Sequence, residues 1–234
     1  MSDGPQAVIL VGGKGTRLGA LTAATPKPLL AVAGRPFLLH LLERLAAAGF
    51  RDVRLLTGYL ASQFDGILPA AQALGLTVTC HVETEPAGTG GALRLAAPAL
   101  ASQFLLMNGD SLFDIDLAGL MAPALPVGRL GRVALRLVAR TDRYGVVRLD
   151  GDRITDFAAK GDPAEPGLIN AGIYWLDRRL VDTIPVGMIS LEADILTGMA
   201  RDGHLLGRVH GGYFIDIGVP DDYARAQTDL AAGP

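Results

Sequence analysis

The stretch Ala7–Leu18, with the sequence AVILVGGKGTRL, decides the fold, and Pro26-Lys27-Pro28 continues it. Its first five residues, Ala7–Val11, are all apolar, which predicts a strand buried on both faces. The strand stops at Gly12–Gly15, where three glycines in four positions allow positive φ and leave no Cβ to hold a ligand off. Successive N–H groups of such a loop can point at an anion. We therefore expect a phosphate-binding loop directly after the first strand.

Two cations and a hydroxyl accompany this loop. Thr16 adds the hydroxyl, and Arg17 adds a fixed fork of donors suited to phosphate oxygens. Lys27 follows ten residues later between two prolines, which stiffen the chain and could fix where its ammonium points. The alternative is a surface turn with solvated cations, but the combination favours a polyphosphate site.

Two other phosphate loops do not fit this stretch. A Walker A loop requires the order G-x-x-x-x-G-K-[ST], whereas Gly13-Lys14-Gly15-Thr16 has the lysine before the last glycine. The dinucleotide fingerprint G-x-G-x-x-G fits the glycines, but Leu18 stands where the third one belongs. That fingerprint also requires an acid after the second strand, and the strand predicted at 53–58 ends without one. A nicotinamide-dependent dehydrogenase is therefore disfavoured.

The pattern G-G-x-G-T-R-L at 12–18, followed by P-K-P at 26–28, resembles the signature of the sugar-1-phosphate nucleotidyltransferases. The resemblance runs from Ala7 to about Gln227. It implies a Rossmann-like α/β fold of three α/β/α layers, with a mixed, mostly parallel central sheet and helices on both faces. Within the family, the segments 34–38, 108–111 and 190–192 look most like D-glycero-α-D-manno-heptose 1-phosphate guanylyltransferases.

Length and composition limit the class of protein. The chain has 234 residues, half of them hydrophobic, which suits one domain with a sizeable core. We expect a single domain over 1–234, with a nucleotide-binding half at about 6–117 and a sugar-phosphate-binding half at about 130–230. A net charge of −3 gives no reason to expect nucleic acid as a partner.

Apolar runs and cysteine usage indicate the compartment. No window approaches the length of a membrane span, and the N-terminus has no signal-peptide core, so we expect a cytoplasmic protein without a membrane partner. The single cysteine, Cys80, fits a reducing compartment, and its apolar context favours a buried hydrophobe over a nucleophile. The four histidines lack paired ligand spacing, which argues against zinc.

Strands and helices alternate in the first half of the chain. After the first strand, the patterns predict strands over 51–58, 76–82 and 104–108 and helices over 36–48, 61–74 and 89–97. This alternation indicates a parallel sheet, in which ligands bind at the carboxyl ends of the strands. Gly12-Gly13, Glu83–Glu85 and Asn108–Asp110 follow predicted strands and should converge. The second half adds a mixed region, with strands over 132–140, 145–149, 153–157, 168–176, 205–210 and 213–217 and helices over 191–201 and 220–231.

Two aspartates are candidate metal ligands. Asp110 follows a buried strand near the phosphate loop, which suits Mg²⁺, although a turn or helix-cap role explains it better when it is taken alone. Asp216 is a lone acid among apolar residues, for which a buried, hydrogen-bonded role is the ordinary interpretation. The family resemblance implies that both bind Mg²⁺: Asn108-Gly109-Asp110 resembles its metal-binding G-D element, and 212–218 its late aromatic-x-Asp-x-Gly motif.

The resemblance also implies where substrates bind. The glycine-rich turn Glu85–Ala92 resembles the segment that lies along the nucleobase and ribose, where Glu85 could accept from guanine N1–H and N2–H₂. Nucleotide-binding roles follow for Val11, Gly12, Gly13, Lys14, Gly15, Thr16, Glu85, Gly90 and Asn108. Sugar-phosphate-binding roles follow for Lys160, Asn170, Gly172 and Glu192. Ala159 departs from the family's usual glutamate before the lysine, and Glu192 also suits a first-turn acid favoured by the helix dipole.

The predicted reaction joins a nucleoside triphosphate, favoured as GTP, to a sugar 1-phosphate, favoured as the heptose phosphate. The catalytic set would be Arg17, Lys27 and Asp110, with Mg²⁺ as cofactor. Mannose 1-phosphate guanylyltransferases and N-acetylmuramate 1-phosphate uridylyltransferases share the core motifs and remain alternatives, as does a nucleotide-sugar-binding regulatory subunit without catalysis. The resemblance is also compatible with a homodimer.

Overall fold

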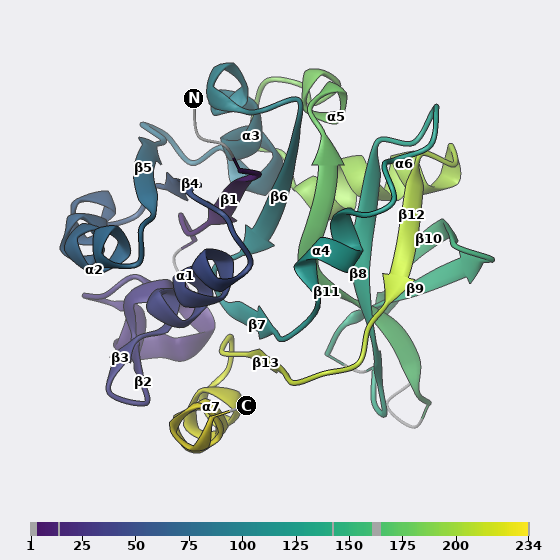
Figure 1. Cartoon of the computed structure of the whole chain (residues 1–234). Coiled ribbons are helices and arrows are strands. Elements are labelled where there is room, and N and C mark those ends of the chain that lie inside the picture. The colour runs from purple at the N-terminus through teal and green to yellow at the C-terminus, as the bar shows by residue number, and fades with distance from the viewer. Residues whose placement is uncertain (1–3, 14, 142, 161–164, 234) are drawn as a thin grey trace. The chain divides into compact units, whose positions relative to one another are not determined.

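The computed structural model describes residues 4–13, 15–141, 143–160 and 165–233 (Figure 1). Within these ranges, no helix is long and apolar enough to cross a membrane. The chain divides into two compact units. The first unit comprises Met1–Pro86, Leu106–Asp114 and Tyr213–Pro234, and the second comprises Ala87–Leu105 and Ile115–Gly212. Each unit draws on separate parts of the chain, and the single-domain organisation stays a prediction.

The first unit is built on a parallel sheet. Strands β5 (Thr77–Val82), β4 (Asp52–Thr57) and β1 (Gln6–Leu10) lie in that order and run parallel. The end of β6 (Gln103–Asn108) follows β1 in the same order. Ala7, Val8 and Ile9 are fully buried, which confirms the first strand as one covered on both faces.

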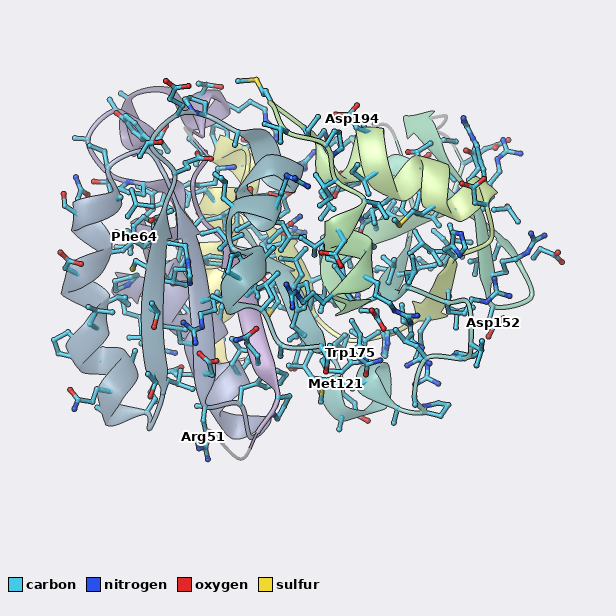
Figure 2. All side chains as sticks on the ribbon, turned by 90° about the horizontal axis from the view of Figure 1, so that it is seen from above. Arg51, Phe64, Met121, Asp152, Trp175 and Asp194 are labelled. Carbon is cyan, nitrogen blue, oxygen red and sulfur yellow. The ribbon has the colours of Figure 1, made fainter. Side chains whose placement is uncertain are left out.

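Helices of the first unit include two of the long predicted ones. Helix α1 (Phe37–Ala47) begins after Pro36, and α7 (Pro220–Ala232) begins with a proline in its first turn. Phe64 is fully buried on the short η3 (Ala61–Ile67) and is labelled in Figure 2. The remaining elements are η1 (Thr16–Thr22), η2 (Lys27–Leu29), α2 (Leu68–Ala73), the hairpin β2 (Ala31–Val32) and β3 (Arg35–Pro36), and the antiparallel pair β7 (Ser111–Phe113) and β13 (Phe214–Asp216).

The second unit is mostly antiparallel. Its strand order is β11 (Gly167–Asp177), β8 (Gly131–Val138), β12 (Leu205–Val209), β10 (Arg153–Lys160) and β9 (Gly145–Asp150). Only β12 and β8 run parallel among the described pairings of this unit, and β9 also pairs with β11 at Val146 and Ile169. The mixed α/β fold is thereby confirmed, with parallel pairs in the first unit and antiparallel pairs gathered in the second.

Short helices accompany these strands: α3 (Gly88–Leu95), η4 (Ala97–Ala99), α4 (Leu117–Met121), α5 (Arg179–Asp182), η5 (Leu191–Leu196) and α6 (Thr197–Arg201). The helix predicted over 191–201 is divided, because η5 is a π-helical turn and α6 an ordinary helix. Ser190 caps this segment by accepting a hydrogen bond from the Ala193 N–H. Trp175, labelled in Figure 2, is buried on β11.

Candidate active site

The glycine loop is stabilised by hydrogen bonds from the residues of η1 that follow it. Gly15 has a left-handed backbone with φ of 61°. Its carbonyl accepts hydrogen bonds from the Leu18 N–H and the Thr22 hydroxyl, each at 3.0 Å. A Cβ at Gly15 would lie 3.0 Å from Thr22 Cγ2 and 3.1 Å from Lys27 Cε. Both the backbone and the close contact with Lys27 therefore require glycine. Lys14 lies outside the described residues.

An acid that the sequence analysis did not select lies at the start of this loop. The Val11 N–H donates to the Leu56 carbonyl at 3.0 Å, which extends the hydrogen bonding between β1 and β4 to the residue before Gly12. A Cβ at Gly12 would lie 3.3 Å from Glu83 Oε1, and one at Gly58 would overlap the same oxygen. Glu83 follows β5 directly, and its place after a predicted strand is the sequence feature that could have identified it as a site residue. Glu85, the predicted base-binding residue, is exposed.

Lys27 and Asp110 form an ion pair within the first unit. Lys27 Nζ lies 2.8 Å from Asp110 Oδ2, and the lysine is buried. Asp110 follows Asn108, the last residue of β6, and its Oδ1 accepts a hydrogen bond of 3.3 Å from the Ser111 hydroxyl. The Gly109 N–H donates to the Leu10 carbonyl at 3.0 Å. Asp110 is thereby fixed beside the end of β1, where the glycine loop begins.

Asp216 joins the same group of charges. β13 pairs with β7 so that Asp216 lies opposite Ser111, and the Ile217 N–H donates to the Asp110 carbonyl at 2.9 Å. Burial, followed by the charge of Asp110, raises the pKa of Asp216. The Gly218 N–H, bonded to Asp216 Oδ1 at 2.6 Å, and the charges of Lys27 and Arg17 oppose this rise in pKa. Two carboxylates and two cations therefore interact here.

The donor set of this group suits a hard divalent cation. Asp110 and Asp216 supply carboxylate oxygens, and the charge of Asp110 raises the cost of charge on Asp216. Among the described residues no cluster of three or more histidine, cysteine, aspartate or glutamate side chains could hold a metal ion. The protein would therefore supply two carboxylates, and phosphate oxygens and water would complete the coordination of Mg²⁺. The residues fit that ion.

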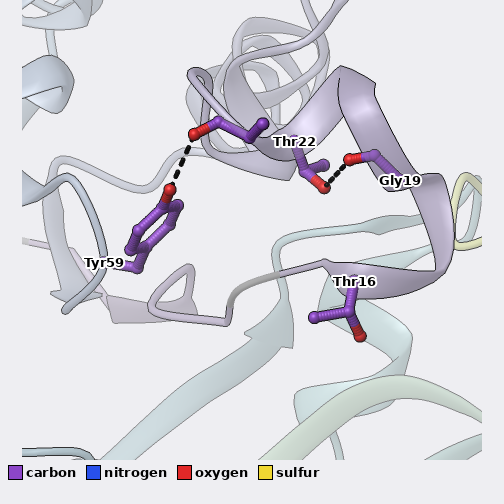
Figure 3. Close-up of a pocket in the computed structure, with 5 residues that line it drawn as sticks. Thr16, Gly19, Thr22 and Tyr59 are labelled. Atoms are coloured by element: carbon purple, nitrogen blue, oxygen red, sulfur yellow. Dashed lines mark hydrogen bonds between the residues drawn. The ribbon is translucent and has the colours of Figure 1, made fainter.

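A hollow of about 310 Å³ lies behind the loop. It is lined by Thr16, Gly19, Thr22, Ala23 and Tyr59 (Figure 3). The Tyr59 hydroxyl donates to the Ala23 carbonyl at 2.7 Å, and the Thr22 hydroxyl is also 3.2 Å from the Gly19 carbonyl. These bonds fix the turn that follows Arg17, whose side chain is exposed. Thr16 and Gly13 are exposed as well, so the loop presents both backbone and hydroxyl groups to solvent.

The second unit brings together three of the predicted sugar-binding residues and one further residue. Asn170 Nδ2 donates to the Tyr174 hydroxyl oxygen at 2.7 Å and to Glu192 Oε1 at 2.9 Å. The Tyr174 hydroxyl donates to Glu192 Oε1 at 2.8 Å. The Gly172 N–H donates to Asn170 Oδ1 at 3.0 Å. Tyr174 was not selected from the sequence, because its apolar neighbours made it look like an ordinary core residue of a strand.

For two other predicted site residues, Gly90 and Lys160, only the backbone can be described. Gly90 is buried in the first turn of α3, and its N–H donates to the Ile189 carbonyl at 2.8 Å. That N–H is therefore already used within the second unit, which leaves close backbone approach as the role open to this glycine. Lys160 is the last residue of β10, where it pairs with Gly145, and its side chain lies outside what the structure describes.

Comparison with known proteins gives consistent matches. A model of the nucleotidyl transferase family matches residues 6–233. The mannose-1-phosphate guanylyltransferase of Mycobacterium tuberculosis is 40% identical over 97% of this chain. The catalytic subunit beta of the mannose-1-phosphate guanylyltransferase of Drosophila melanogaster is 37% identical over 95%. The chain spans 65% and 62% of the lengths of these two relatives.

A solved structure resembles the whole chain. The crystal structure of HddC from Yersinia pseudotuberculosis in complex with GMP-PN matches with a TM-score of 0.84 and 32% sequence identity. The match covers 96% of this chain and 99% of HddC. The similarity therefore extends over both units.

Proposed function

This chain belongs to the nucleotidyl transferase family, and we propose that it transfers a nucleoside monophosphate from GTP to a sugar 1-phosphate. The observation that carries the proposal is the group formed by Lys27, Asp110, Asp216 and Arg17 beside the glycine loop. A triphosphate would supply negative charge to the two cations of this group, and its oxygens would complete the coordination of a Mg²⁺ ion held by the two carboxylates. The products would be a nucleotide-sugar and pyrophosphate.

The chemistry requires positioning and neutralisation of charge. A phosphate oxygen of the sugar 1-phosphate attacks the α-phosphorus of the triphosphate, and the bond from the α-phosphorus to the bridging oxygen of the pyrophosphate breaks. No general base is needed, because a phosphate monoester with a second pKa of about 6 is mostly dianionic at neutral pH. The obstacle is repulsion between two anions, which fixed cations and N–H groups relieve.

Within the first unit, the roles divide by chemistry. The backbone from Val11 to Thr16 and the guanidinium of Arg17 would bind the triphosphate oxygens. Lys27 would bind phosphate oxygens as a point charge once Asp110 has another cation to bind. Asp110 and Asp216 would hold Mg²⁺, which supplies neutralisation of the charge on the phosphate oxygens when it is bound. Asn108 would contact the nucleotide from the end of β6.

Two glutamates are candidates for contact with the nucleobase. Glu83 is half-buried beside Gly12 and Gly58, and Glu85 is exposed two residues later. Either carboxylate could accept from the N1–H and N2–H₂ of guanine, a pair of donors that uracil and adenine do not present together. GTP is favoured because the names of the two relatives specify guanylyltransferases and HddC was crystallised with GMP-PN.

The sugar is proposed from two sources that differ. Residues 34–38, 108–111 and 190–192 resemble the heptose 1-phosphate guanylyltransferases, whereas the relatives named above act on mannose 1-phosphate by their names. We favour the heptose phosphate and keep mannose 1-phosphate as the second candidate. Asn170, Gly172 and Glu192 would contact sugar hydroxyls, and Lys160 the sugar phosphate.

The test is release of pyrophosphate with Mg²⁺ across a grid of substrates. GTP, UTP, dTTP, CTP and ATP would each be combined with heptose, mannose, glucose and N-acetylmuramate 1-phosphates. Turnover with GTP and the heptose phosphate, lost in Asp110→Asn, supports the proposal in full. Turnover with another pair keeps the reaction and rejects the proposed substrates. Binding of a nucleotide-sugar without turnover on any pair would instead support a regulatory subunit.

A further inference from the structure

A closed triangle of hydrogen bonds links Tyr174, Asn170 and Glu192 in the second unit. Glu192 Oε1 accepts from both the Tyr174 hydroxyl, at 2.8 Å, and Asn170 Nδ2, at 2.9 Å. Asn170 Nδ2 also donates to the Tyr174 hydroxyl at 2.7 Å. Among the described residues, no hydrogen bond or ion pair involves Glu192 Oε2. One carboxylate oxygen is therefore saturated and the other is left for a ligand.

The burial of the partners differs sharply across this triangle. Tyr174 is fully buried, with 0% of its surface exposed, whereas Glu192 is exposed. A buried phenol needs a hydrogen-bond partner, but a nearby backbone carbonyl would serve that need. An exposed glutamate normally samples several rotamers, and holding it in one costs side-chain entropy of up to about 2 kcal/mol. Here the core of the unit fixes the orientation of a surface carboxylate, which is how a binding group is preorganised.

The backbone of β11 is shaped to bring these side chains together. Against β8, Asn170 lies opposite Leu135 and Tyr174 opposite Val133, so four steps along β11 match two steps along β8. Gly172 lies inside this bulge with φ of 74°, and its N–H fixes the Asn170 amide through Oδ1. Bulges re-aim side chains, often next to functional sites.

The segment that carries Glu192 is also fixed. It is the π-helical η5, a geometry frequent at functional sites. The Ser190 N–H donates to the carboxylate of Asp194, labelled in Figure 2, at 2.7 Å. The Leu191 N–H donates to the Thr89 hydroxyl at 2.8 Å, which ties η5 to the start of α3. Backbone hydrogen bonds therefore fix both segments that carry the triangle: the bulge of β11 with Asn170 and the segment η5 with Glu192.

We propose that Tyr174 is a positioning residue that orients Glu192 so that Oε2 accepts a hydrogen bond from a ring hydroxyl of the sugar substrate. This inference rests on the proposed function, and it assigns to the core of the second unit a part in sugar selection. Tyr174 itself touches no substrate in this scheme. It acts through Glu192, and Asn170 closes the arrangement.

The test measures steady-state kinetics of Tyr174→Phe, Glu192→Gln and the double variant, with each substrate varied in turn while the other is saturating. Tyr174→Phe deletes only the hydroxyl, and we expect it to raise the KM for the sugar 1-phosphate on the order of tenfold, as for loss of one hydrogen bond to a charged group. The KM for the nucleoside triphosphate should not change. If Tyr174 acts through Glu192, the double variant should match Glu192→Gln alone.

A panel of sugar 1-phosphates that each lack one ring hydroxyl gives a readout that a purely structural role would not move. The wild-type protein should discriminate against one analogue, and Tyr174→Phe should reduce that discrimination. Tyr223→Phe is the matched control, because it also deletes a phenol hydroxyl, one that donates to the Ala31 carbonyl at 2.8 Å in the first unit. Its KM for the sugar phosphate should stay at the wild-type value.

Three results would overturn the proposal. They are a KM for the sugar phosphate that Tyr174→Phe leaves unchanged, an equal rise in the KM for the triphosphate, and effects of Tyr174 and Glu192 that multiply in the double variant. Should Tyr174→Phe fail to fold, Glu192→Asp tests the same contact from the exposed side, because the shorter carboxylate cannot keep its bond to Tyr174, and an unchanged KM would reject the proposal.

Failure of the proposed function would look different. In that case the wild-type protein would turn over no pair of substrates. The interaction between Tyr174 and Glu192 would still be testable by urea unfolding of the same single and double variants. Coupling between Tyr174 and Glu192 in the free energy of unfolding would retain the triangle, and strict additivity would reject it.

Discussion

Lys27 Nζ lies 2.8 Å from Asp110 Oδ2, although 83 residues separate them in the sequence. The lysine side chain is only 10% exposed, and the aspartate 31%. Lys27 also packs against Gly15 of the glycine loop. The side-chain carbons of Lys27 therefore lie against the proposed phosphate loop, while its ammonium pairs with a proposed metal ligand and offsets the charge on Asp110 in the free protein.

Replacing Lys27 by methionine should lower turnover on the order of 100-fold, because a fixed charge that stabilises phosphoryl transfer is lost. The unfolding free energy should fall by about 1 kcal/mol, because a partly exposed carboxylate loses its partner. Pyrophosphate release and urea unfolding measure the two effects. Arg179→Gln is the control, since it removes an ion pair of 2.9 Å with Asp177 at the surface of the second unit. Equal losses in both variants would contradict a specific role for Lys27.

Asp216→Asn should separate metal binding from folding. The buried Asp216 carboxylate is opposed by the charge of Asp110, so removing its charge should leave the metal-free protein as stable as wild type or more stable. At a Mg²⁺ concentration ten times the dissociation constant, the wild-type protein should gain about 1.4 kcal/mol, a gain that EDTA reverses. Thermal unfolding with Mg²⁺ or EDTA measures this difference. An equal Mg²⁺-dependent gain in Asp216→Asn would exclude this residue as a ligand.

Glu83→Gln and Glu85→Gln should differ in their effect on the choice of base. The Glu83 carboxylate is half-buried beside Gly12 and Gly58, whereas Glu85 is exposed, and an acceptor with less freedom to move discriminates better. We expect Glu83→Gln to raise the KM for GTP by about tenfold, as for one charged hydrogen bond. Glu85→Gln should have a smaller effect. Competition between GTP and UTP measures the change, and the reverse ranking would restore Glu85 as the base-contacting residue.

The glycine loop and its strand could be predicted because the signal is local. Five apolar residues and three closely spaced glycines need no information from the rest of the chain. The contact of Glu83 with Gly12 could not be predicted, because it depends on the register between β4 and β5. The role of Tyr174 was hidden for a similar reason: a bulge in β11 turns a core residue toward a helix 18 residues away in sequence. Elements as short as β2, β3 and β7 give no periodic pattern at all.

His40 should make the protein less stable as the pH falls below about 6.5, the unperturbed pKa of histidine. Its Nε2 lies 3.0 Å from the Val32 carbonyl and its Nδ1 lies 3.2 Å from Arg35 Nη2. A carbonyl only accepts and a guanidinium only donates, so Nε2 carries the hydrogen and the ring is neutral. Burial first, and the charge of Arg35, lower the pKa of His40, while the bond to Val32 opposes this.

Between the lowered pKa of the folded state and about 6.5, the unfolded chain binds more protons than the folded one, so stability is lost on acidification. One such group contributes a slope of at most about 1.4 kcal/mol per pH unit. Urea unfolding from pH 8 to pH 5 should show a shallower slope in His40→Gln. Part of the slope should remain, because burial also lowers the pKa of His81 and His210. If His40→Gln left the slope of stability against pH unchanged, His40 would be protonated as readily in the folded state as in the unfolded chain.

Gly88→Ala should destabilise the second unit far more than Gly198→Ala does. Gly88 has φ of 72° at the start of α3, and an added Cβ would lie 2.5 Å from the Ile189 carbonyl oxygen. A left-handed backbone and a backbone clash together should cost about 2 to 4 kcal/mol. Gly198→Ala is the matched control, because nothing lies within 4 Å of an added Cβ there and alanine favours the helix α6.

The control, Gly198→Ala, should gain about 0.5 to 1 kcal/mol in free energy of unfolding, because alanine has the higher helix propensity. Urea unfolding gives both values. Because Ile189 leads into η5, the replacement of Gly88 should also displace Glu192 and raise the KM for the sugar 1-phosphate more than that for the triphosphate. Equal changes in the two KM values would show that the start of α3 serves both substrates, and a stable Gly88→Ala protein would show that this turn can rearrange.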